Sequence, residues 1–125
     1  MALYISLQKK IEGFDESVDG KGVARAEAAL DKIARKLGVT PLMDFFSASA
    51  EEMKDFDVDI PDAPPATFFD GNAGLRTVQA LRAYLEQHPK ELKDGAWVLD
   101  DLKEFERVLS KAAEHCVGWH LCVDT

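Results

Sequence analysis

Alternating apolar and polar positions at the two ends of the chain predict two short strands. Near the start, Leu3, Ile5 and Leu7 alternate with more polar residues, which is the period of a half-buried strand. Near the end, Gly118 precedes a second alternating run, whose apolar members are Trp119, Leu121 and Val123. Each strand therefore offers one apolar face to a core.

The segment from Val23 to Leu37 predicts a long amphipathic helix between these strands. Its apolar residues recur with a period of about 3.6 residues and form one stripe. The stripe contains Val23, Ala26, Leu30, Ile33, Ala34 and Leu37. Gly38 follows at the position where glycine commonly ends a helix.

Two further helices are predicted over residues 72–87 and 98–115. Asp70 is the expected N-cap of the first, and Pro89 ends it because proline cannot continue a helix. The second carries an equally long apolar stripe and stops before Gly118. Its paired carboxylates, Asp100–Asp101, stand in the expected first turn, where the helix dipole favours negative charge.

Shorter elements fill the remainder. Thr40 is the expected N-cap of a short helix or turn that runs through Pro41 to Phe46. A capping-box pattern predicts another short helix over residues 49–56. An acidic loop rich in proline is expected over residues 55–67.

These elements predict an α+β fold that is predominantly helical, with three main helices and some short ones. Two isolated strands are marginal unless they pair and pack against helices. We therefore expect the N-terminal and C-terminal strands to form one small sheet. No composition shift divides the chain, so residues 1–125 are expected to form a single compact domain.

Charge and composition narrow the classes of function. The chain has 15 Lys and Arg against 23 Asp and Glu, a net charge of -8, so it lacks the basic footprint of nucleic-acid binding. No apolar run approaches the ~20 residues that span a bilayer. Two cysteines do not make a disulfide framework. A soluble, cytoplasmic protein without nucleic-acid or membrane partners is expected.

The terminal strand contains the main candidates for reactive or metal-binding side chains. They are the residues that alternate with its apolar positions: His120, Cys122 and Asp124. An imidazole, a thiol and a carboxylate in one row suit a metal or a catalytic site, but they also suit the solvated face of an ordinary strand. A zinc site needs three or four ligands, usually from several elements. Helical phase places Cys116 in the core and turns His115 away, so neither completes a ligand set.

A nucleophilic pair of Cys122 and His120 would need sulfur and ring nitrogen within hydrogen-bond reach. Side chains two apart on one strand, about 6.5–7 Å along it, rarely achieve this without distortion. We therefore predict no metal, no cofactor and no assigned catalytic residue. His120, Cys122 and Asp124 are the candidates if the protein is an enzyme.

Two features favour contact with another protein. Phe68 and Phe69 are adjacent: either one of them remains partly exposed and offers a contact surface, or the loop wraps both rings into the core. Asp57 and Asp59 belong to an acidic ladder that lacks the glycine and glutamate of a calcium loop, so they are expected to stay solvated.

The function that these residues predict is a small acidic module for protein binding or regulation. The alternative is a small enzyme or metal-binding protein that uses His120, Cys122 and Asp124. We expect a monomer or a weak dimer, because an open edge of the small sheet could pair with a second copy.

Overall fold

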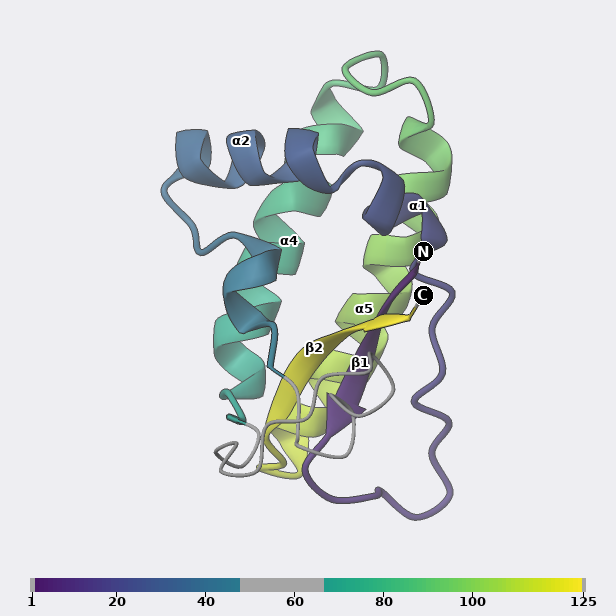
Figure 1. Cartoon of the computed structure of the whole chain (residues 1–125), viewed down its shortest axis with the longest axis vertical. Coiled ribbons are helices and arrows are strands. Elements are labelled where there is room, and N and C mark those ends of the chain that lie inside the picture. The colour runs from purple at the N-terminus through teal and green to yellow at the C-terminus, as the bar shows by residue number, and fades with distance from the viewer. Residues whose placement is uncertain (1, 48–66, 125) are drawn as a thin grey trace, which may run out of the picture.

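The two ends of the chain form the sheet, as the alternating patterns predict. The computed structural model describes residues 2–47 and 67–124. Strand β1 (Ala2–Leu7) pairs antiparallel with strand β2 (Trp119–Asp124), from Ala2 opposite Asp124 to Leu7 opposite Trp119 (Figure 1). The fold is the expected α+β arrangement, mainly helical, with one small sheet.

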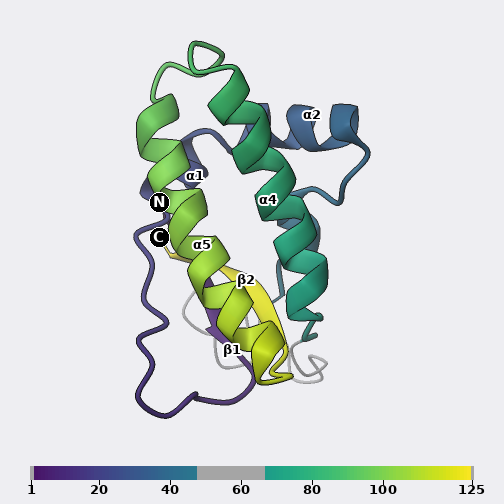
Figure 2. The same ribbon diagram turned by 180° about the vertical axis from the view of Figure 1, so that it is seen from behind.

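Two long helices form a layer against the sheet. Helices α4 (Gly71–Gln87) and α5 (Gly95–Glu114) run side by side, and Figure 2 shows them in front of both strands. The shorter elements α1 (Lys21–Arg25), α2 (Glu27–Leu37) and the 3-10 helix η1 (Leu42–Phe45) pack around this frame. Within the described ranges, no helix combines the length and the apolar character that crossing a membrane requires.

Trp119 occupies the core between the two layers. Its side chain is fully buried, its indole Nε1 donates to the carbonyl of Asp70 at 3.1 Å, and its ring lies 4.9 Å from that of Phe45. A Cβ at Gly74 would lie 2.3 Å from the indole, so α4 approaches the tryptophan closely because it has glycine there. The core also contains other large, fully buried side chains, among them Phe105, Leu3, Leu30, Leu81, Leu85, Leu102, Leu109 and Leu121.

The prediction of one helix from Val23 to Leu37 is wrong in one respect. Two helices, α1 and α2, occupy this segment. Helix α1 ends at Arg25, Ala26 adopts φ -96° and ψ 7°, and α2 starts at Glu27. The first helix packs on β1 and α5, whereas the second packs on α4 and η1 (Figure 1). One straight helix could not turn its apolar stripe to both surfaces, so tertiary packing overrides the local period.

The predicted helix ends are mostly confirmed. Gly38 ends α2 in the left-handed conformation with φ 76°, and the side chain of Asp70 accepts from the Asn72 amide at 3.1 Å at the start of α4. The short helix after residue 40 is η1. The predicted cap at Thr40 is wrong, because Pro41 itself occupies the N-cap position, with extended backbone, and no side chain caps η1.

The last predicted helix is shifted towards the N-terminus. It starts at Gly95 rather than residue 98 and ends at Glu114, so Asp101 lies beyond the first turn. Cys116 follows the helix with φ 55° and is exposed. Its predicted place in the core is therefore wrong, because the chain turns before the helical stripe reaches it.

Candidate functional site

His120 and Cys122 share one face of the sheet with two hydroxyl-bearing residues of β1. The register places Tyr4 opposite Cys122 and Ser6 opposite His120, and directly opposite side chains lie on the same face. The Sγ atom of Cys122 lies 3.3 Å from Nδ1 of His120. The expectation that strand spacing would keep this pair apart is wrong, because the imidazole turns along the strand to meet the thiol.

This pair is closed to solvent. His120 is 1% exposed and Cys122 is 3% exposed, and the ring of Phe68 lies 5.1 Å from the imidazole. A solvated face for the terminal strand is therefore the wrong expectation at these two positions. The backbone of Asp124 continues β2 opposite Ala2. Across the described part of the chain, no group of three or more His, Cys, Asp and Glu side chains could hold a metal ion.

The adjacent phenylalanines divide between core and surface. Phe69 pairs with the backbone of Trp119 in both directions, at 2.7 and 3.0 Å, and its ring meets that of Phe45 edge to face at 5.3 Å. Phe68 remains 37% exposed. The partner-binding candidates Asp57 and Asp59 lie outside the described residues, as does the predicted helix over residues 49–56.

The outer edge of β1 is partly unpaired. The Gln8 amide donates to the Gly118 carbonyl at 2.8 Å. Because hydrogen-bonded pairs alternate along an antiparallel ladder, Tyr4 and Ser6 also point their backbone groups at β2. By alternation, Leu3 and Ile5 point theirs away from β2. The Leu3 amide donates to Gly20 at 3.1 Å, whereas no backbone hydrogen bond joins Ile5 to another part of the described chain at this edge.

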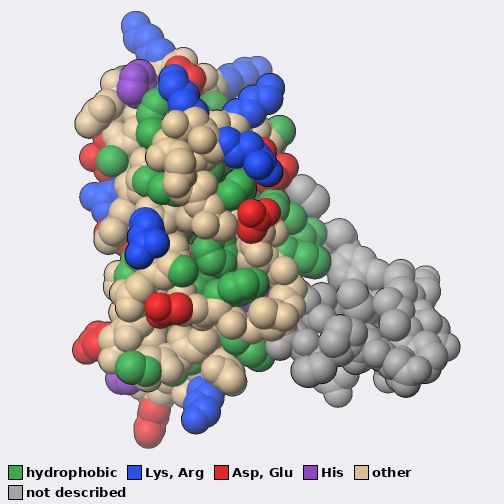
Figure 3. All heavy atoms as spheres, turned by 90° about the vertical axis from the view of Figure 1, so that its left-hand side faces the viewer, with side chains coloured by type: hydrophobic (Ala, Val, Ile, Leu, Met, Phe, Trp, Pro, Cys, Tyr) green, Lys and Arg blue, Asp and Glu red, His purple; other side chains and the backbone are tan. Residues whose placement is uncertain are grey.

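The outer edge of β2 is covered instead. The Ser47 amide donates to the Leu121 carbonyl at 3.2 Å, and Phe69 bridges Trp119. On the covered side, Figure 3 shows hydrophobic side chains at the surface among charged side chains of both signs. Among the described residues, the outward backbone groups of Ile5 therefore have no backbone partner at the outer edge of β1.

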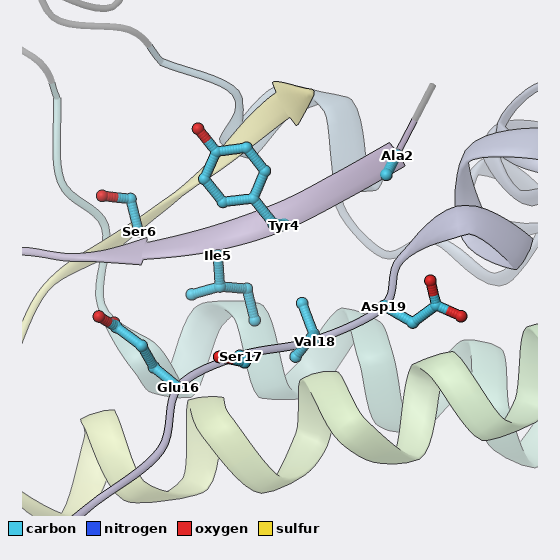
Figure 4. Close-up of a pocket in the computed structure, with 8 residues that line it drawn as sticks. All are labelled: Ala2, Tyr4, Ile5, Ser6, Glu16, Ser17, Val18 and Asp19. Carbon is cyan, nitrogen blue, oxygen red and sulfur yellow. The ribbon is translucent and has the colours of Figure 1, made fainter. Parts of the chain in front are cut away.

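A cavity of about 550 Å³ opens beside this free edge. One wall is β1, through residue 2 and residues 4–6, and the other is the extended segment 16–19 (Figure 4). We call this cavity the β1 slot. Its volume falls within the range of about 300–1,000 Å³ typical of ligand sites.

Two contacts fix the outer wall of the slot. Arg107 of α5 donates to the carbonyls of Asp15 at 2.8 Å and Ser17 at 3.1 Å. At the other end, Gly20 has φ 67°, and a Cβ there would lie 1.6 Å from the Leu3 carbonyl oxygen. The outer wall is therefore anchored to α5 near residue 16 and to β1 at Gly20. Between these two points the slot separates it from β1.

The slot is polar and acidic. Figure 4 shows Glu16 reaching from the outer wall towards β1, near Ser6, with Asp19 at the far end of the same wall. The Oε2 atom of Glu16 is buried and has no hydrogen-bond partner among the described residues. Hydrogen bonds from Ser17, with a smaller effect of Arg107, lower the pKa of nearby Asp15 below its ordinary value. The outer wall thus contributes the carboxylates of Glu16 and Asp19 to the slot, with Asp15 next to Glu16 and the Arg107 guanidinium bound to the same segment.

Asp101 is a buried carboxylate whose position the sequence interpretation missed. It is 3% exposed, and its Oδ2 accepts from the Val23 amide at 3.1 Å, at the start of α1. Desolvation raises the pKa of this carboxyl, while hydrogen bonds from the amides of Val23 and Gly22 oppose the rise. Its place three residues after Val98 and four before Phe105 was the available signal, because that spacing puts it on the buried face.

Comparison of the chain with models of protein families, with curated proteins and with solved structures finds no match.

Proposed function

We propose that this protein is a protein-binding module that takes up an extended segment of a partner along the free edge of β1. The observation that carries the proposal is the opening of this edge, at Ile5, into the β1 slot. Strand addition uses such an edge, because the backbone amide and carbonyl of the host supply hydrogen bonds to any extended chain.

The walls of the slot suit this mode of binding. An exposed sheet edge is normally covered or blunted, and here the covering segment 16–19 is tied to α5 by Arg107 and is followed by Gly20, which meets β1 at Leu3. Ile5 itself is buried in the core through its side chain, so the edge that it presents is rigid.

Selection from a phage-displayed library of random peptides against the full chain tests this proposal. We expect the selected peptides to shift the backbone amide resonance of Ile5 in NMR spectra. Substitution Ser17→Trp should fill the slot and abolish binding, whereas the matched control Ser110→Trp, on an exposed position of α5, should leave it intact.

Two results would contradict the proposal. One is selection of peptides whose binding leaves the Ile5 amide unchanged and survives Ser17→Trp. The other is a stable dimer at micromolar concentration that Ser17→Trp dissociates, because a second copy of the chain would then occupy the edge. Light scattering distinguishes the dimer from the monomer.

A second candidate function is favoured by the contact of Cys122 with His120. A thiol 3.3 Å from an imidazole has the geometry of an activated nucleophile, although both side chains are closed to solvent. Rapid reaction of Cys122 with a thiol reagent near neutral pH would support this enzyme alternative. Stoichiometric zinc in the purified protein, lost on Cys122→Ala, would support a metal-binding protein instead.

A further inference from the structure

We infer that the segment bound in the β1 slot carries a Lys or Arg side chain, which pairs with Glu16. This inference rests on the proposed function and names the chemistry of the partner. It starts from the buried oxygen Oε2 of Glu16, which has no hydrogen-bond partner among the described residues. Buried polar atoms are almost always paired, so a donor on the guest would satisfy an acceptor that the described residues leave without a partner.

A cationic side chain is the donor that best suits this carboxylate. Among the described residues, no Lys, Arg or His lines the slot; its described lining consists of residue 2, residues 4–6 and residues 16–19. Arg107 lies behind the outer wall, but its guanidinium donates to the carbonyls of Asp15 and Ser17 and to the carboxylate of Glu104. None of these hydrogen bonds is to the carboxylate of Glu16.

The charges around the slot favour the same partner. Asp19 lies on the same wall as Glu16, Asp15 lies next to Glu16 with a lowered pKa, and the whole chain has a net charge of -8. An acidic groove attracts basic ligands and speeds their association. A hydrogen bond from a charged donor to a carboxylate is about twice as strong as a neutral one.

The position of Glu16 also predicts where the cationic side chain lies. Glu16 reaches towards β1 at the Ser6 end of the slot (Figure 4), while Ile5 offers its free backbone groups in the middle. A guest strand that bonds to Ile5 therefore places one of its side chains near Glu16. A free linear amine would reach Glu16 equally well but would leave the edge of Ile5 unpaired, so the contacts favour a peptide.

The test compares peptides selected from the same random library by the wild-type chain and by variants. Selection by the wild type should enrich Lys or Arg at one position of the peptide. Glu16→Gln should lose this preference and bind the wild-type peptides about tenfold more weakly, which is the usual scale of a charged hydrogen bond. Glu12→Gln, the same change on an exposed residue of the same loop, should retain both.

A charge reversal and an ionic-strength series sharpen the test. Glu16→Lys should select peptides with Asp or Glu at the position where the wild type selects a cation. Raising the salt concentration should weaken binding to the wild type more than binding to Glu16→Gln, because screening acts on the charge pair.

The outcomes separate this inference from the proposed function. Peptides that shift the Ile5 amide without a basic preference, or that bind Glu16→Gln with unchanged affinity, would overturn the inference and leave strand addition standing. Failure of every selected peptide to perturb Ile5 would overturn both. Spermidine binding as tightly as the peptides, with the same dependence on Glu16, would show that the occupant is a small amine.

Discussion

Asp101 shows how one side chain can decide the start of a distant helix. Its carboxylate accepts from the Val23 amide, although the two residues are 78 positions apart in sequence. We predict that Asp101→Ala destabilises the fold by about 1–2 kcal/mol, because it removes this cap and leaves a buried amide unpaired. Asp101→Asn keeps an oxygen acceptor and should cost less. Urea unfolding of both variants measures the difference.

The pH dependence of Asp101→Asn follows from the direction of its pKa. Burial raises the pKa of the folded carboxyl above that of the unfolded chain, so the folded state binds more protons in the window above about pH 4. The contribution of Asp101 to stability therefore falls as the pH rises through this window. Relative to wild type, Asp101→Asn should gain stability from pH 4 to pH 7, and a constant difference would contradict the raised pKa.

The two cysteines should differ sharply in reactivity. Cys116 is exposed after α5, whereas Cys122 is buried against His120. We predict that an aromatic disulfide reagent labels one thiol rapidly in the native protein and the second only after denaturation, since access limits the buried thiol. Cys116→Ser should remove the rapid phase. A rapid phase that persists in Cys116→Ser would come from Cys122 and would favour the enzyme alternative.

At the scale of elements, local pattern accounts for most of the fold. Period-two alternation predicts both strands, and the helical stripes predict α4 and α5 to within a few residues. The break at Ala26 could not be predicted in this way, because it depends on the separate surfaces against which α1 and α2 pack. The contact of Cys122 with His120 could not either, because it depends on side-chain rotation, which strand spacing does not fix.

The alternation of backbone groups along β1 predicts which of its amides exchange rapidly with solvent. The Tyr4 and Ser6 amides point at β2, whereas the Ile5 amide points into the slot. We therefore expect the Ile5 amide to exchange with solvent much faster than its two neighbours in the free protein, because exchange of a bonded amide requires local opening. Equal protection of Ile5, Tyr4 and Ser6 would mean that the edge is already paired.

At the scale of the whole molecule, the slot is a product of contacts between distant segments. Its inner wall is fixed by the pairing of the two ends of the chain, and its outer wall by Arg107 near the end of the sequence. Neither the slot nor the buried Oε2 of Glu16, which has no partner among the described residues, has a local signature in the sequence. The acidic composition predicts only the sign of the charge that a partner would meet.

Gly20 lies where the two walls of the slot meet, so its substitution tests whether the outer wall is rigid. Gly20 and Gly38 both have positive φ, 67° and 76°, but an added Cβ would strike the Leu3 carbonyl at Gly20 and meet nothing within 4 Å at Gly38. Gly38→Ala should therefore cost only the backbone penalty, about 1–2 kcal/mol. Gly20→Ala should cost about 1–3 kcal/mol more, because β1 or the outer wall must move. Thermal unfolding measures both variants.

Displacement of the wall in Gly20→Ala should also weaken binding of the selected peptides, which Gly38→Ala should retain. Equal destabilisation by the two variants would mean that the wall yields without cost and that the slot is not rigid.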